Sequence, residues 1–103
     1  MHRGTLARHE LETVDCAEDF GAHITRWRKV NNMSAGDVAD RASVTRETLR
    51  NLENGTGTPR MDSLFAVLAV VGIADDVVEA ANPYNSDVAR VRIDEILRTG
   101  GTL

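Results

Sequence analysis

Two short helical patterns lie between Met33 and Gly55, and they constrain the fold of this chain more than any other feature. The first pattern ends in VADRA, the second runs TRETLRNLENG, and about three residues separate them. Ser34 and Thr45 are residue types that cap the start of a helix, and Gly55 is the residue type that most often ends one. We therefore expect a helix, a tight turn and a second helix set across the first.

The composition favours a small all-α domain. The chain has 103 residues, of which 42% are hydrophobic and 4% aromatic, and β-branched residues nowhere alternate with polar ones over a long stretch. No apolar run approaches the roughly 18 residues that a membrane-spanning helix needs. The first residues do not read as a signal peptide, and the single cysteine, Cys16, allows no internal disulfide. These features predict a cytoplasmic protein that has no contact with membranes.

Apolar spacing predicts five helices and a helical extension. Phe20, Ile24 and Trp27 form one stripe of the first helix, where Trp27 should be buried, and Asn32 should end that helix in the left-handed conformation. The other four helices are predicted over residues 34–42, 45–54, 61–71 and 75–81. We divide the chain into a flexible or weakly ordered arm over residues 1–16, a five-helix domain over residues 17–82 and a helical extension over residues 83–103.

Charge is unevenly distributed along the chain, although the formal net charge is −4. Residues 1–19 carry −3, residues 20–60 carry +3 and residues 61–103 carry −4. The one basic segment contains the two short helical patterns. Because salt screens charges beyond about 8–10 Å, a local basic surface can attract phosphate although the whole chain is acidic. The alternative is that this modest excess marks only a solvated surface.

The phrase Asn51-Leu52-Glu53-Asn54-Gly55 and the turn before it resemble the Cro/C1-type, or Xre, family of helix-turn-helix repressors. The resemblance implies a five-helix DNA-binding domain whose third helix enters the major groove. The chain departs from the family at two positions. Ala35 stands where a glutamine is common, and Ser43 stands at a turn position that glycine often holds.

The outward side of the third helix is polar. At about 100° per residue, Leu49 and Leu52 mark its core side. Guanidinium, amide, carboxylate and methyl groups each match the edge of a particular base in the major groove, so we expect base reading there. The alternative is an ordinary solvated helix face, which is polar as well. The residues expected to read bases are Arg46, Glu47, Thr48 and Asn51.

A second group should touch the DNA backbone. The amides of Ser34 and Ala35 start the second helix and could bind a phosphate, and Arg50 is long enough to reach one. The resemblance implies backbone contacts for Asn54 and Arg60.

An ion pair should support the third helix. Glu53 lies near the core side of that helix, where a lone carboxylate would be costly to bury, and Arg28 lies at the edge of the first-helix stripe. The resemblance implies the same partner. We predict a buried Arg28–Glu53 pair that fixes the angle of the third helix, with an exposed pair as the alternative.

No catalytic group, metal site or cofactor site is predicted. The three histidines are scattered, and neighbouring carboxylates such as Asp75 and Asp76 point in different directions on a helix. We therefore expect that the protein is not an enzyme.

The function predicted from the sequence is that of a DNA-binding transcriptional regulator, most simply a repressor that binds a near-palindromic operator as a homodimer. The alternatives are an antitoxin, which would bind a protein toxin and its own promoter, and a helix-turn-helix scaffold that has lost DNA binding. The residues expected at a dimer or partner interface are Val88, Ile93, Ile96 and Leu97, which could instead pack back on their own domain.

Overall fold

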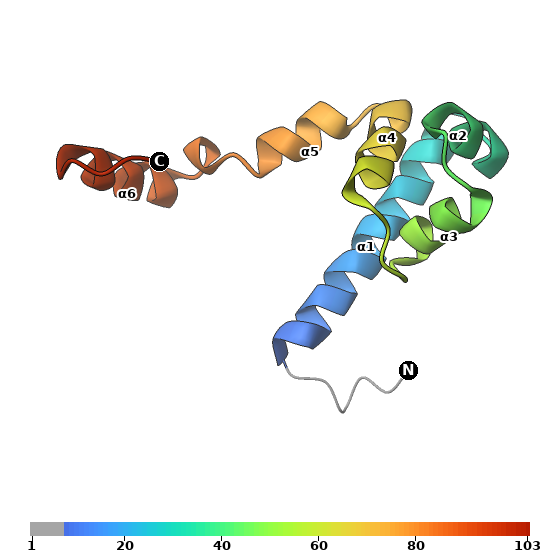
Figure 1. Ribbon diagram of the computed structural model, residues 1–103, viewed down its shortest axis with the longest axis horizontal. Coiled ribbons are helices and arrows are strands. Elements are labelled where there is room, and N and C mark those ends of the chain that lie inside the picture. Colours follow the sequence, from blue (N-terminus) through green and yellow to red (C-terminus); the bar gives the residue numbers. More distant parts are fainter. Residues whose placement is uncertain (1–7) are drawn as a thin grey trace. The chain divides into compact units, whose positions relative to one another are not determined.

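All regular elements in the described part of the chain are helical, which confirms the all-α class (Figure 1). The computed structural model describes the backbone of residues 8–103 and the side chains from residue 12 onward. None of the helices in that range has the length and apolar character needed to cross a membrane. The elements are α1 (Arg8–Val30), α2 (Ala35–Ala42), α3 (Arg46–Asn54), α4 (Met61–Val71), α5 (Ala74–Ala80), the 3-10 turn η2 (Pro83–Asn85) and α6 (Asp87–Arg98).

The first helix is longer than predicted. It begins at Arg8 rather than at residue 17, so the prediction of a weakly ordered arm is wrong for residues 8–16. Residues 1–7 lie outside the described part of the chain. The physical reason is that residues 8–20 contain good helix formers and neither glycine nor proline, so nothing interrupts a helix that the packed residues further on already stabilise.

The chain divides into two compact units between Ile73 and Ala74. Unit 1 contains α1 to α4, and unit 2 contains α5, η2 and α6. The predicted five-helix domain over residues 17–82 therefore differs from the observed grouping, which places the fifth helix with the extension. Gly72 ends α4 at a positive φ of 90°, and none of the residues of α5 is buried.

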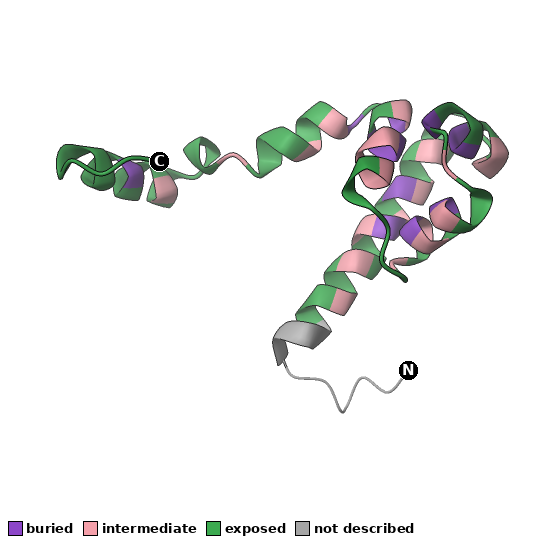
Figure 2. Ribbon diagram, viewed as in Figure 1, coloured by how far each residue is buried: buried purple, intermediate pink, exposed green. Residues whose placement is uncertain are grey.

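The core of unit 1 joins all four of its helices. Helix α1 packs against α3 and α4, and α2 packs against the same two helices. Asn31 at the end of α1 donates from Nδ2 to the carbonyl oxygen of Val71 at 2.8 Å, which ties α1 to the end of α4. Figure 2 shows the buried positions of the unit facing one another. The buried residues are Ile24, Val38, Ala39, Ala42, Leu49, Leu52, Val67, Leu68, Val71 and Ile73.

Trp27 does not belong to this core, because 43% of its surface is exposed. The prediction that it would be buried is wrong. The inward side of α1 carries Gly21, which is buried, and Arg28, which bonds to α3. At about 100° per residue Gly21 and Arg28 lie about 20° apart around the helix and Ile24 lies about 40° beyond Arg28, so Trp27, about 100° from Arg28, falls at the outer edge of the stripe.

The turns around α2 have the predicted conformations. Asn32 and Ser43 both have a φ of 57°, the left-handed region that few residues other than glycine adopt. Ser34 caps α2 reciprocally: its hydroxyl accepts from the amide of Asp37 at 3.1 Å, and its own amide donates to the Asp37 carboxylate at 3.0 Å. The bond from the Ser34 amide, and after it the interaction of the carboxyl with the Ser34 side chain, hold the pKa of Asp37 below its ordinary value.

Unit 2 is held together mainly by polar contacts at its bends. The side-chain amide of Asn85 donates to the backbone carbonyl and the carboxylate of Glu79, and Asn82 donates to the same carboxylate. Ser86 caps α6 by accepting from the amide of Ala89 at 3.2 Å. Ile93 is the one buried residue of this unit, all of which the structure describes. The predicted interface residues Val88, Ile96 and Leu97 are exposed.

The strained turn at Ser43 leads to a prediction. Ser43→Gly should raise the free energy of unfolding by about 0.5–1 kcal/mol, because a left-handed L-residue costs more than the added entropy of an unfolded glycine. Urea denaturation measures this change. Ser63→Gly, within α4, serves as the control and should lower the same quantity by about 0.5–1 kcal/mol. Equal destabilisation by both variants would contradict the assignment of strain to Ser43.

Candidate nucleic-acid interface

Helices α2 and α3 form a helix, a turn and a second helix. Helix α2 ends at Ser43, whose amide donates to the carbonyl oxygen of Asp40 at 3.2 Å, and Val44 donates to Ala39 at 3.0 Å. Thr45 then caps α3, because its hydroxyl accepts from the amide of Thr48 at 3.0 Å. The turn therefore contains three residues, as the sequence predicts, and both helices bury their apolar sides in unit 1.

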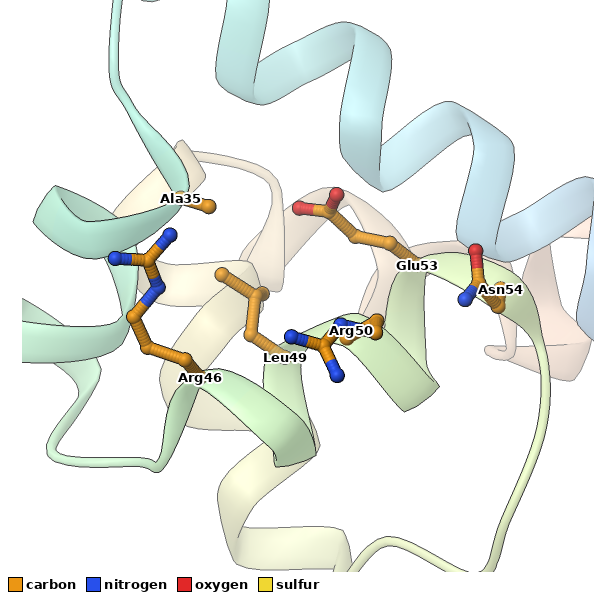
Figure 3. Close-up of a pocket in the computed structure, with 6 residues that line it drawn as sticks. All are labelled: Ala35, Arg46, Leu49, Arg50, Glu53 and Asn54. Carbon is orange, nitrogen blue, oxygen red and sulfur yellow. The ribbon is translucent and has the colours of Figure 1, made fainter.

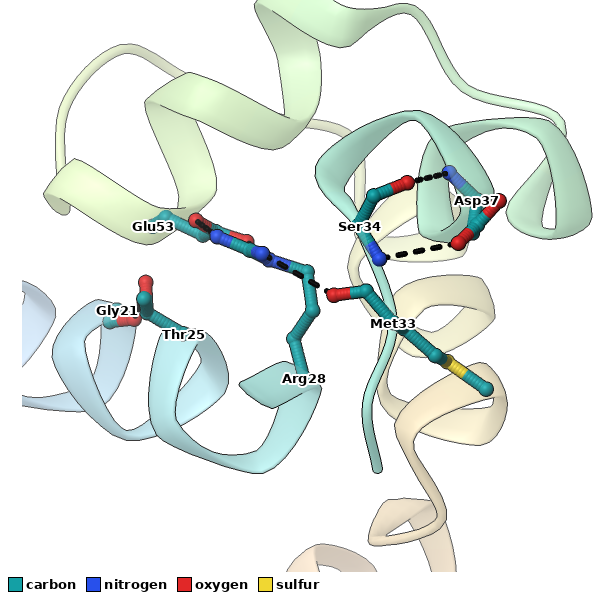
Figure 4. Close-up of polar contacts among 7 residues, drawn as sticks. All are labelled: Gly21, Thr25, Arg28, Met33, Ser34, Asp37 and Glu53. Atoms are coloured by element: carbon teal, nitrogen blue, oxygen red, sulfur yellow. Dashed lines mark hydrogen bonds and ion pairs between the residues drawn. The ribbon is translucent and has the colours of Figure 1, made fainter. Parts of the chain in front are cut away.

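The predicted ion pair between Arg28 and Glu53 is present (Figure 4). The Arg28 guanidinium donates to both carboxylate oxygens of Glu53, from Nε at 2.8 Å and from Nη2 at 3.0 Å. Its Nη1 also donates to the carbonyl oxygen of Met33 at 3.2 Å. The side chains are only 14% and 13% exposed, so the pair is largely buried. The hydrogen bond to Glu53 raises the pKa of Arg28 above its already high ordinary value.

Two glycines allow the backbone of α3 to approach the backbone of α1. A Cβ atom on Gly21 would overlap the carbonyl oxygens of Leu52 and Glu53. A Cβ atom on Gly55, whose φ is 68°, would overlap the α1 backbone at Ala17 and Glu18. Gly55 could be assigned to the end of the helix from the sequence, whereas the role of Gly21 was not predicted. A glycine inside a helical pattern lowers the stability of the helix, so its presence at position 21 indicates close packing of another element there.

The structure places the four predicted base-reading residues in different surroundings. Glu47 is exposed, and Arg46 is exposed with its guanidinium lying beside the first turn of α2. Thr48 is half-buried, and its hydroxyl accepts from the hydroxyl of Thr45 at 2.9 Å. Asn51 is half-buried as well and packs against the loop after α3, where Thr56 donates to its side-chain oxygen at 3.4 Å.

The predicted backbone-contact residues also differ from one another. Arg50 and Asn54 are exposed on α3, and within residues 8–103 neither has a hydrogen-bond or ion-pair partner. The Ser34 amide is used by the capping bond to Asp37, whereas Ala35 begins α2 with its amide outside that bond. Arg60 pairs with Asp62 at 3.1 Å, and both side chains are largely exposed.

A small pocket lies between the start of α2 and the outer side of α3 (Figure 3). Its volume is about 130 Å³, and its polar lining comes mainly from α3. Figure 3 shows the Arg46 guanidinium directed toward the first turn of α2, where Ala35 lies. The lining residues are Ala35, Arg46, Leu49, Arg50, Glu53 and Asn54.

This geometry agrees with the comparison to known protein families, in which residues 19–81 match a family of helix-turn-helix domains. The chain belongs to the helix-turn-helix domain family. No curated protein and no solved structure matches it. The family match includes α5, although α5 groups with α6 in the contacts of this structure.

Within this helix-turn-helix domain, the outer side of α3 has a free polar surface. The side chains of Glu47, Arg50 and Asn54 are exposed there and make no hydrogen bond or ion pair with any other described residue. The polar surface of the domain is thus available to a ligand, while the opposite side of α3 is fixed by Leu49, Leu52 and the ion pair.

The buried ion pair leads to a prediction. Arg28→Ala should lower the free energy of unfolding by roughly 2–4 kcal/mol, because it leaves the Glu53 carboxylate largely buried without a partner. Thermal or urea denaturation followed by circular dichroism measures the loss. Arg60→Ala breaks an exposed pair and is the matched control, with an expected loss under about 0.5 kcal/mol. Similar small losses in both variants would show that the Arg28–Glu53 pair does not support the domain.

Proposed function

We propose that this helix-turn-helix protein is a sequence-specific DNA-binding transcriptional regulator of the Cro/C1 type. The observation that carries the proposal is the free polar surface of α3, whose opposite side is held rigidly by core residues and a bidentate ion pair. A rigid helix with exposed polar groups suits the major groove, where base edges present donors and acceptors in fixed patterns.

Base reading is assigned first to Glu47 and Asn54, whose side chains are exposed and without partners among the described residues. For Asn54 this assignment replaces the backbone contact that the resemblance implies. A carboxylate accepts from the amino group of cytosine, and a side-chain amide matches adenine. Thr48 and Asn51 could contribute only by giving up their contacts to Thr45 and Thr56, so we place them at the border of the reading surface.

The DNA backbone would be held by groups around this surface. The free amide of Ala35 and the Arg50 side chain lie on the α2 side of α3. Arg60 would exchange its exposed contact with Asp62 for a phosphate, which is a small loss because exposed pairs contribute little. Ser34 serves the same surface indirectly, by capping α2.

We further propose a homodimer, because one recognition helix reads too few base pairs to select a site, and a repressor role as its simplest use. Unit 2 supplies candidate contacts, since Val88, Ile96 and Leu97 are exposed on α6. Ile93 is buried inside the unit and would support that surface rather than form it.

The same surface favours a second candidate function, that of an antitoxin. Unit 2 carries six acidic residues and three arginines, and it exposes large apolar side chains next to them. Such a surface can bind a basic protein partner while unit 1 binds DNA. The two functions differ in what unit 2 contacts, and a toxin gene beside this one would favour the antitoxin.

Selection of bound duplexes from a random DNA pool tests the proposed function. We expect a near-palindromic consensus whose half-sites lie about 34 Å, or roughly ten base pairs, apart. Repeating the selection with Asn54→Ala should relax the preference at one position of each half-site. A pool that stays random after selection with the unaltered protein would contradict sequence-specific recognition.

A double substitution tests the proposed dimer. Ile96→Asn combined with Leu97→Asn should convert the dimer to a monomer in sedimentation velocity, because both changes place polar amides in an apolar interface. Val78→Asn is the control, since Val78 is exposed as well but lies on α5, and this change should leave the sedimentation coefficient unchanged. A double variant that remains dimeric would exclude this side of α6 as the interface.

A further inference from the structure

The pocket between α2 and α3 has an excess of positive charge that no described residue neutralises. Arg46 and Arg50 line it, and neither forms an ion pair with any residue in the described part of the chain. Glu47 follows Arg46 in the sequence but does not line the pocket, and two other carboxylates on α2 and α3 are occupied elsewhere. Glu53 accepts both bonds of the Arg28 guanidinium, and Asp37 accepts from the amide of Ser34. The pocket therefore presents two guanidinium groups to solvent.

The Arg46 guanidinium lies beside small residues at the start of α2. Its Nη1 atom lies 3.5 Å from the place that a Cβ atom on Gly36 would occupy. Ala35 contributes only a methyl group to the same wall. The guanidinium therefore rests against the first turn of α2 instead of extending from the end of α3, as Figure 3 shows.

We propose that this pocket binds a phosphate of the DNA backbone and that Arg46 is its clamp, so that Arg46 sets the affinity for DNA of any sequence and does not select a base. This inference rests on the proposed function, since it names the part of the DNA that one residue of the interface contacts. It revises the expectation from the sequence, in which Arg46 reads a base edge.

The chemistry of the pocket suits a phosphate better than a base. A guanidinium donates two parallel hydrogen bonds to a phosphate and is charged at every pH at which the protein folds. Phosphates border the major groove on both sides, so a guanidinium held beside α2, at the edge of the free polar surface, is placed to meet the backbone. Arg50 adds a second positive charge on the same side of α3.

Two measurements on the full chain test the proposal. The first follows the amides of Ala35 and Gly36 by NMR during titration with inorganic phosphate. We expect their signals to shift in the unaltered protein and to stay in place in Arg46→Ala. Arg46 is exposed and has no partner among the described residues, so this variant should keep the fold, which circular dichroism checks.

The second measurement compares binding to the selected consensus duplex and to a random-sequence duplex over a range of salt concentrations. Arg46→Ala should weaken both by roughly the same factor, about tenfold, and should reduce the slope of log affinity against log salt by about 0.9. Arg46→Lys should keep the slope, because it keeps the charge. Arg26→Ala is the matched control, since it removes an equal charge from the outer side of α1 and should leave both quantities unchanged.

The outcomes separate this inference from the proposed function. Loss of affinity for the consensus alone, with a changed base preference, would show that Arg46 reads a base and would overturn the inference. The inference would also be overturned if the amide signals of Ala35 and Gly36 did not shift when phosphate is added to the unaltered protein. If the unaltered protein binds neither duplex, the proposed function fails. If the amide signals nevertheless shift with phosphate and this shift depends on Arg46, the pocket binds another anion, and its assignment to DNA is overturned.

Discussion

The position of α3 against α1 is the constraint on which the rest of unit 1 depends. Two kinds of contact fix it. The glycines at 21 and 55 let the two backbones approach closely, and the Arg28–Glu53 pair joins the same helices through side chains. A short helix of nine residues has little stability of its own, so its orientation must come from such contacts. Because the side chains of Glu47, Arg50 and Asn54 make no hydrogen bond or ion pair with other described residues, the inner contacts decide the direction in which that surface points.

Much of unit 1 could be predicted from local sequence signals. Ser34, Thr45 and Gly55 cap or end their helices as expected, because capping depends on residues only a few positions apart. The Arg28–Glu53 pair could be predicted because an acidic residue close to the core side of a helix requires a partner. Each of these predictions depended either on residues close together in the sequence or on the large free-energy cost of burying an unpaired charge.

The errors arose where packing between helices decides the outcome. Trp27 has the spacing of a core residue, but the inward side of α1 is centred between Gly21 and Arg28, and a single helical stripe cannot reveal which helix covers it. The surroundings of Thr48 and Asn51 could not be predicted for a similar reason. A helical wheel gives the direction of a side chain but not the hydroxyl or loop that it meets, so it did not reveal the contacts of these two residues with Thr45 and Thr56.

Unit 2 has a consequence for how the protein behaves in dilution. Thirty residues with a single buried side chain release little apolar surface from water, and segments of this size are rarely stable without a disulfide, a metal or a second chain. In the proposed dimer their folding would be coupled to association by mass action, so the melting of α5 and α6 would shift with protein concentration while unit 1 keeps a fixed midpoint. At low concentration this segment would be open to proteases, so occupancy of its apolar surface would also govern the lifetime of the chain.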